Sequence, residues 1–427
     1  MSRQHKRKRS PSPKNNIESH SHRRRAVLGV LGFLALAVLV YVVLKVQLSG
    51  MDQTTTSQAS AAGSKVEVLF QNTVKRTYAI DKSFRRVYSA GWEGANGAIG
   101  VAHLFAATGD QGLLYSFTNT YRMQDMFNGT WVDDRAWICL AEMYWWDFAG
   151  RQNAGWVDDA KQRYLQAKKE GRLSNHEGFW SWYNWPPNAV PPGEKLITNS
   201  NMNQMATAAC MLYAATGETQ FYDDALRIWD GDTRYPGVER MFYKGNGRWE
   251  GKSGLAAFGE QFPWQGAGYC SIGAALYRMT GDKKYKDVAV AIAKRVMDPA
   301  NGWVDGQDYY QVRMDGNGAF VHYILDAYMI APEELPDIPM KIEKMLEHVW
   351  SNHHGSAAVT LRRTEDDGIR NGWNPNGGED GYGVNEVGTV HAQSQAVRAF
   401  GVFAYVLGQQ LKKEKGTSRT TAADSLE

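Results

Sequence analysis

The chain has 427 residues and is rich in aromatic side chains, with 15 Trp and 21 Tyr. Its formal net charge of +3 is unevenly distributed, because residues 1–25 carry nine Lys/Arg and one acid, whereas the residues after Lys45 carry 38 basic and 44 acidic side chains. The mildly acidic folded part argues against a nucleic-acid partner.

Residues 26–48 are predicted to be a transmembrane signal anchor. Ala26–Leu44 contains 19 residues without a charge, and a helix of that length, at about 1.5 Å per residue, nearly spans the hydrocarbon core of a bilayer. The positive-inside rule predicts that residues 1–25 form a basic cytosolic tail. We therefore expect a single-pass type II membrane protein whose folded part lies in the lumen of the secretory pathway, as in the Golgi, or outside the cell. Cleavage of the anchor near QASAAGS is the alternative.

Two segments are expected to lie outside the folded domain: a flexible stalk over residues 49–74, and a disordered tail over residues 412–427. The three cysteines, Cys139, Cys210 and Cys270, lie within apolar helical patterns, which predict buried free thiols. No Cys/His spacing indicates zinc, and we expect neither a metal ion nor another cofactor.

A repeated helical unit runs through residues 75–411. Each copy has an apolar helix rich in small residues, and the clearest copies continue with a Thr-Gly-acid turn and a second helix marked by Tyr and Ala. The apolar helices begin near Gly100, Ala136, Ala208, Ile272, Gly318 and Ser394. No polar capping repeat is visible, so a closed ring is favoured over an open solenoid. We predict an all-α fold, an (α/α)6 barrel preceded by one N-terminal transmembrane helix.

The letters WVDD occur twice, 25 residues apart. Asp133 and Asp134 start a strongly apolar inner helix, so their carboxylates are expected to project towards a central cleft. Two such close charges cannot both stay ionised cheaply, so one pKa should rise while the other stays low. Glycoside cleavage requires this division into acid and nucleophile, and adjacent residues suit the separation of roughly 5–5.5 Å in retaining enzymes. An N-terminal helix cap is the alternative.

The second pair, Asp158 and Asp159, precedes the stretch AKQRYLQAKKEGR, which is charged on all sides. This pattern is typical of a solvated outer helix. We expect these two carboxylates to cap that helix and to take no part in chemistry.

The stretch WVDDRAWICLAEMY resembles the Asp-Asp-x-x-Trp signature of glycoside hydrolase family 76, the endo-α-1,6-mannanases and the related fungal cell-wall transglycosidases. HEGFWSWYNW, ITNSNMNQMATAAC, PWQGAGYC and RMDGNGAFVHYIL resemble further family motifs in the same order. The resemblance covers roughly residues 75–410. It implies an (α/α)6 barrel in which Asp133 is the nucleophile and Asp134 the general acid/base. The family's Tyr-Asn-Gln-Gly block is Pro263-Trp264-Gln265-Gly266 here, and its Gly-Gly-x-x-Trp region has lost a glycine, so the natural substrate stays open.

Substrate-binding residues are expected among aromatic rings, which stack on sugar faces, and amides, which bind hydroxyls. The predicted set is Trp131, Trp137, Trp180, Trp182, Asn201, Gln204, Trp264, Gln265 and Tyr269. For each Trp, packing inside the barrel is an equal alternative. His322 is more often structural at such a position.

Together these features predict a membrane-anchored retaining glycoside hydrolase or transglycosylase that acts on α-1,6-mannosides of lumenal or cell-surface glycans. Its partners would be an α-mannose-containing oligosaccharide or polysaccharide, and the membrane. Hydrolysis and transglycosylation share a covalent intermediate, so side-chain identities do not separate them. Two alternatives stay open: a glycan-binding pseudoenzyme on the same barrel, and another (α/α)6 sugar enzyme such as an epimerase.

Overall fold

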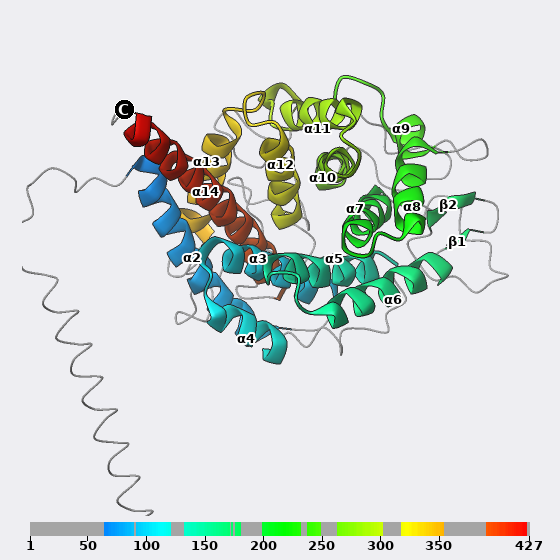
Figure 1. Ribbon diagram of the computed structural model, residues 1–427, viewed down its shortest axis with the longest axis horizontal. Helices are drawn as coiled ribbons and strands as arrows, with labels where there is room; N and C mark the ends of the chain where they lie inside the picture. Colours follow the sequence, from blue (N-terminus) through cyan, green and yellow to red (C-terminus); the bar gives the residue numbers. More distant parts are fainter. Residues whose placement is uncertain are drawn as a thin grey trace, which may run out of the picture. The chain divides into compact units, whose positions relative to one another are not determined.

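The chain is built almost entirely of helices where its structure is described (Figure 1). The computed structural model describes residues 64–88, 91–120, 132–170, 172–173, 176–180, 199–231, 237–248, 263–301, 317–353 and 390–424. All of these belong to the unit Ser64–Glu427. The predicted cytosolic tail and anchor lie outside the described residues. Among the residues that are described, no helix is both long and apolar enough to span a membrane.

Six of the described helices form an inner ring. They are α3 (Trp92–Thr108), α5 (Val132–Phe148), α7 (Asn199–Thr216), α10 (Pro263–Thr280), α12 (Asn317–Ile330) and α14 (Val390–Asp424). Each packs against the next, and α14 packs against α3, so the ring closes. Most of α3 and α5 is buried on every side, because neighbouring inner helices and the outer layer cover them.

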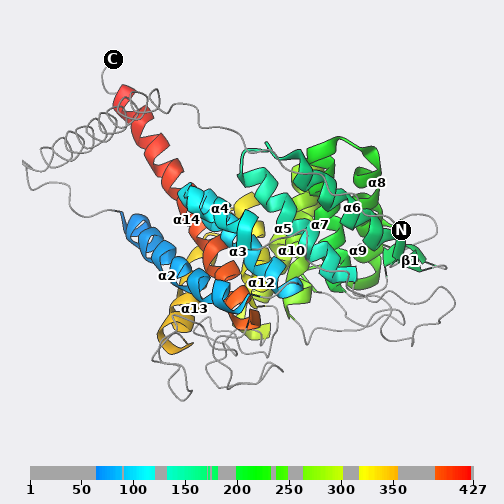
Figure 2. The same cartoon turned by 90° about the horizontal axis from the view of Figure 1, so that it is seen from below.

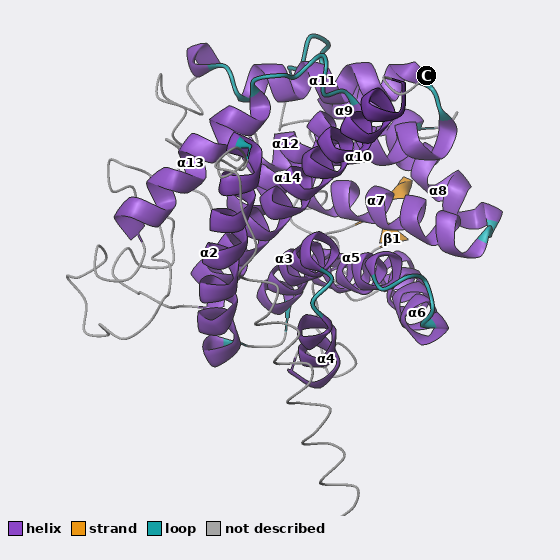
Figure 3. Cartoon of the chain, turned by 60° about the vertical axis from the view of Figure 1, so that its left-hand side comes forward, coloured by secondary structure: helices purple, strands orange, loops and turns teal. Residues whose placement is uncertain are grey.

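A second layer of helices surrounds this ring. Its members are α4 (Gln111–Thr120), α6 (Ala154–Glu170), α8 (Thr219–Asp230), α11 (Lys283–Val296), α13 (Ile338–His353) and α2 (Lys65–Val87). The first five follow their inner partners in the chain, whereas α2 packs against α14 and completes the layer. The short elements are α9 (Gly237–Phe242), the turn η2 (Pro299–Asn301) and the strands β1 (Arg172–Leu173) and β2 (His176–Trp180), with strands orange in Figure 3. The predicted all-α barrel is confirmed.

Both ends of the folded unit differ from the sequence prediction. Helix α2 begins at Lys65, inside the segment expected to be a stalk, and the Ser64 hydroxyl caps it by accepting the Glu67 N–H at 3.2 Å. Thr77 and Phe84 of α2 are buried, so this helix belongs to the fold. Helix α14 runs on to Asp424, through the segment expected to be disordered, and its end projects beyond its neighbours in Figure 2.

Short turns join three of the inner helices to their outer partners, as the repeat predicts. Gly109, Gly217 and Gly281 adopt φ values of 71°, 70° and 72°, a left-handed conformation that glycine enters without steric cost. The threonine before each glycine hydrogen-bonds to the backbone on both sides of the turn. In the third copy, Thr280 donates to the Leu276 carbonyl at 2.7 Å and accepts the Asp282 N–H at 3.1 Å.

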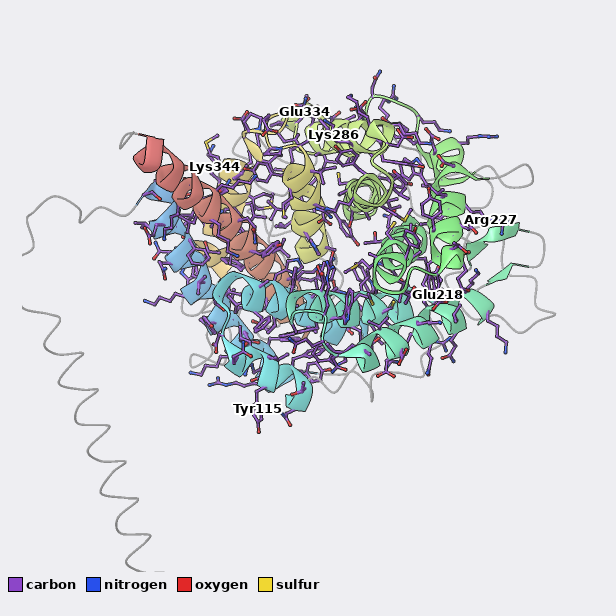
Figure 4. The ribbon with its side chains drawn as sticks, in the orientation of Figure 1. Tyr115, Glu218, Arg227, Lys286, Glu334 and Lys344 are labelled. Carbon is purple, nitrogen blue, oxygen red and sulfur yellow. The ribbon has the colours of Figure 1, made fainter. Side chains whose placement is uncertain are left out.

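Ion pairs lie on the outer surface of the barrel. Lys286 of α11 lies 2.8 Å from Glu334, in the connection after α12, and Figure 4 shows the two side chains close together at the edge of the molecule. Tyr115 of α4 is exposed on another side (Figure 4). Exposed pairs of this kind contribute little to stability. The barrel therefore depends on the packing of its inner ring.

The contact between α3 and α14 requires glycine at Gly401. A Cβ there would lie 2.2 Å from the Gly100 carbonyl oxygen, a backbone atom that cannot move aside easily. We predict that Gly401→Ala lowers the free energy of unfolding by about 1–3 kcal/mol or more, as overpacking does. Urea denaturation followed by circular dichroism measures this change.

Gly408→Ala is the matched control, because it lies on the same helix and its Cβ would come no closer than 3.4 Å, to the Phe70 ring. We expect it to be neutral or to stabilise the helix by up to about 1 kcal/mol. Equal destabilisation by both substitutions would contradict the close approach of α3 and α14.

Candidate active site

The first aspartate pair lies where the sequence predicts, in the first turn of the inner helix α5. The Asp133 carboxylate accepts the Asp134 N–H at 3.1 Å. Asp133 is half-buried, whereas the side chain of Asp134 is 7% exposed. The two neighbouring carboxyl groups therefore occupy different environments.

This difference separates the two groups electrostatically. Burial raises the pKa of Asp134 to about 8, and the negative charges of Asp133 and Glu93 add to the rise, while Arg135 opposes it. Asp134 is therefore protonated at neutral pH. One member of the pair thus has the raised pKa that an acid catalyst needs, as the sequence analysis expects.

Glu93 is a third carboxyl group at this end of the barrel that the sequence analysis missed. It lies in the first turn of α3, the inner helix that packs against α5. Burial raises its pKa, and its charge raises the pKa of Asp134. The available signal was its position at the start of an inner helix, because these starts gather at one end of the ring.

Trp137 lies one helical turn after Asp133 and forms part of the core below the pair. Its side chain is 4% exposed, and the guanidinium carbon of Arg398 lies 4.6 Å from its ring centre. The Tyr323 ring is nearly parallel to it, at 11°, with a centre-to-centre distance of 6.5 Å. Trp137 therefore packs inside the barrel, and its predicted role as an open platform for sugar is not supported.

Arg398 of α14 holds a buried polar network at the centre of the ring. The guanidinium donates a hydrogen bond to Asn96 Oδ1. It also donates to His322 Nδ1, which lies 3.1 Å from the Nε atom of Arg398. Since Nδ1 accepts, the His322 ring proton resides on Nε2, which lies 3.3 Å from the Tyr144 hydroxyl. Burial and the charge of Arg398 lower the pKa of His322 well below its ordinary value. His322 is neutral and structural, in agreement with the sequence analysis.

Two other predicted substrate contacts are also buried. Gln204 is 1% exposed, and Tyr269 is fully buried with its ring 6.0 Å from that of Trp229 on the outer helix α8. Tyr269 therefore faces the outer layer and not the axis of the barrel, and its position does not support contact with a substrate. For the other predicted residues, either the whole residue or its side chain lies outside the described part of the structure. These are Trp131, Trp180, Trp182, Asn201, Trp264 and Gln265.

The second aspartate pair does not cap its helix. Helix α6 begins at Ala154, and Asn153 provides the cap by accepting the Gly155 N–H at 3.1 Å. Asp158 and Asp159 follow in the next turn, where Asp158 is exposed. The two aspartates lie on an outer helix, as predicted, but the predicted cap is wrong, because the helix starts earlier than the charged stretch suggests.

The three cysteines are free and buried, which confirms the prediction. Burial raises the pKa of each thiol, so none of them is an activated nucleophile. Within the described ranges, no group of His, Cys, Asp and Glu side chains is arranged to hold a metal ion. The groups considered for acid–base chemistry at the start of α5 are therefore the carboxyl groups of Glu93, Asp133 and Asp134.

Solved structures of known proteins share this architecture. No protein-family model and no curated protein sequence matches the chain. The α-1,6-mannanase GH76A of Salegentibacter sp. HEL1_6 matches with a TM-score of 0.61 and 15% identity, over 78% of this chain and 99% of that one. A glycoside hydrolase family 76 mannosidase of Bacteroides thetaiotaomicron VPI-5482 matches with a TM-score of 0.57 and 17% identity, over 81% and 100%.

A fungal structure matches equally well. Dfg5 from Chaetomium thermophilum, solved in complex with glucosamine, has a TM-score of 0.60 and 13% identity, over 83% of this chain and 93% of that one. These matches extend over most of the folded unit, and the mannanases among them are assigned to one family. The chain therefore has the fold of these glycoside hydrolase family 76 structures.

Proposed function

We propose that the chain is a retaining glycoside hydrolase or transglycosylase that acts on α-1,6-mannosides. The observation that carries this proposal is the pair at the start of α5, where a buried carboxyl group of raised pKa, Asp134, adjoins a more accessible one, Asp133. A protonated acid next to an ionised nucleophile is the starting state of a retaining glycosidase.

In the proposed reaction, Asp134 donates its proton to the glycosidic oxygen while the Asp133 carboxylate attacks the anomeric carbon. The bond to the leaving sugar breaks, and a glycosyl ester forms on Asp133. Asp134, now ionised, then removes a proton from the attacking hydroxyl as the ester is cleaved. Water as the acceptor gives hydrolysis, and a sugar hydroxyl gives transglycosylation.

The relatives of similar fold support the choice of substrate. An inactive variant of the Salegentibacter mannanase, in which two adjacent aspartates are replaced by asparagine, was solved with α-1,6-mannotriose. A second inactive variant was solved with α-1,6-mannotetrose. The adjacent aspartates of this chain make α-1,6-linked mannose the substrate to test first.

The buried histidines weaken the case for an epimerase. His103 and His322 face each other with ring centres 4.8 Å apart, but both are buried. Burial lowers the pKa of His103 to about 3, and its Nδ1 donates to the Ile99 carbonyl at 2.7 Å. Rings whose pKa is lowered so far stay neutral and are poorly suited to exchange protons with a sugar.

Asp133→Asn and Asp134→Asn are each expected to reduce the turnover of α-1,6-mannotetraose by at least about 10²-fold, because one removes the nucleophile and the other the general acid. Chromatography of the products, with the purified full-length chain, measures the rate. In ¹H NMR, the first product released by the unaltered chain should have the α configuration.

Asp158→Asn is the matched control, since this exposed aspartate also follows a Trp-Val pair. It should retain full activity. An active Asp133→Asn variant, or a first product of β configuration, would exclude the proposed mechanism. Binding of the tetrasaccharide without any turnover would favour a glycan-binding protein.

The proposed acid should lower the stability of the fold as the pH rises. The folded-state pKa of Asp134 is about 8, above its ordinary value of 3.8, so between these values the folded state holds a proton that the unfolded state releases. Asp134→Asn does not titrate, so it removes this loss of stability with rising pH. We predict that the variant gains stability relative to the unaltered chain by up to about 1.4 kcal/mol per pH unit between pH 4 and 8. Urea denaturation at several pH values measures the slope, and a constant difference would contradict the burial of this carboxyl group.

We also propose that residues 26–48 anchor the barrel on the lumenal or outer face of a membrane, as the uncharged stretch Ala26–Leu44 and the preceding basic residues indicate. In cells, the full-length chain should stay in the membrane fraction after alkaline carbonate extraction. Its C-terminal part should be protected from added protease in sealed microsomes. Release of the chain by carbonate would exclude the anchor.

A further inference from the structure

A cavity of about 480 Å³ lies at the end of the barrel opposite Asp133 and Asp134. Its walls come from the second halves of the inner helices, including Tyr144 and Phe148 of α5. Tyr144 follows Asp134 by ten residues, which corresponds to about 15 Å along the helix axis. The layer that contains Arg398 and His322 lies between the two ends. This cavity is therefore separate from the proposed catalytic site.

The two ends of the barrel differ in their connections. In the chain, long connections such as residues 354–389 precede the starts of inner helices. Short turns at Gly109, Gly217 and Gly281 follow the inner helices at the cavity end. The lining residues named here all lie in or directly after the described helices.

A group of polar side chains lines part of this cavity. Asp326 of α12 is 8% exposed and accepts the hydroxyl of Ser271 at 2.8 Å. The Nη1 atom of Arg278 lies 3.6 Å from the other carboxylate oxygen, which is long for a direct hydrogen bond. A hydroxyl group placed between Arg278 and Asp326 could accept from the first and donate to the second.

The remaining lining is largely apolar, with several aromatic rings, and balanced in charge. The rings of Phe148 and Tyr405 lie 5.1 Å apart, and Arg151 lies over the ring of Trp146 at 5.4 Å. Arg151 also pairs with Asp147 at 2.8 Å. The lining thus holds two acidic and two basic side chains, so it favours neither an anion nor a cation.

We propose that this cavity is a saccharide-binding site, remote from the aspartate pair, which takes one or two neutral hexose residues. Its volume lies within the roughly 300–1,000 Å³ of small-molecule sites, and apolar walls with a few converging polar groups are typical of them. A sugar ring presents an apolar face to Phe148 and Tyr405 and hydroxyls to Asp326, Ser271 and Arg278. An acyl chain would exclude water from Asp326 and Arg278 without adding a hydrogen bond to either, which is unfavourable.

Methionines inside the cavity allow a local test. Met279 and Met329 line it, whereas Met340 of α13 is 48% exposed and does not. The full-length chain, with Asp133→Asn to prevent turnover and ¹³C-labelled methionine methyl groups, is titrated with α-1,6-mannobiose and separately with maltose. We expect saturable shifts of the Met279 and Met329 methyl signals with at least one of the sugars, and none of Met340.

Two further variants connect these shifts to the cavity. Asp326→Asn keeps the shape of the side chain but removes its charge, and should weaken binding about tenfold or more. Ala275→Phe, in the cavity wall, should abolish the shifts by filling the space, and circular dichroism checks that each variant is folded. The proposal is wrong if neither sugar shifts Met279 or Met329. It is also wrong if laurate shifts them and the sugars do not, since that result would identify a lipid site.

Discussion

The buried guanidinium of Arg398 is the interaction on which the centre of this barrel depends. The residue is 1% exposed, and its contacts with Asn96, Trp137 and His322 connect α14 to α3, α5 and α12. A buried charge is stable only while its partners are in place, and loss of one partner typically costs about 3–5 kcal/mol. The network therefore requires a single arrangement of four inner helices, including the helix that carries the aspartate pair.

This cation also explains the state of the histidines beside it. Burial is the main cause that lowers the pKa of His103 and His322, and the charge of Arg398 adds to it in both. The unfolded chain binds protons at these positions below about pH 6.5 and the folded chain does not, so acidification weakens the fold. Asp134 acts in the opposite direction, because its raised pKa weakens the fold as the pH rises. The barrel thus holds buried groups whose titration changes the stability of the fold in opposite directions.

The direction of the inner helices gives the two ends of the barrel different chemistry. The starts of the helices bring together carboxyl groups, because Glu93 and Asp134 both lie in first turns. At the other end, short glycine turns follow three of the helices, and the second halves of the inner helices line a cavity. A single repeated unit, helix followed by turn followed by helix, therefore produces two separate sites of different character.

The sequence by itself determined the helical class, the repeated glycine turns, the buried cysteines and the position of Asp133 and Asp134 on an inner helix, since each depends on local periodicity or on neighbouring residues. It did not decide whether Trp137 and Tyr269 contact a substrate or pack inside the barrel, where the structure buries both. An aromatic residue on an inner helix has the same local pattern whether its ring faces the cleft, the core or the outer layer. The sequence also missed Glu93, Arg398 and the distal cavity. Those features join residues such as Asn96 and Arg398, about 300 positions apart, so only the closure of the ring decided which side chains meet.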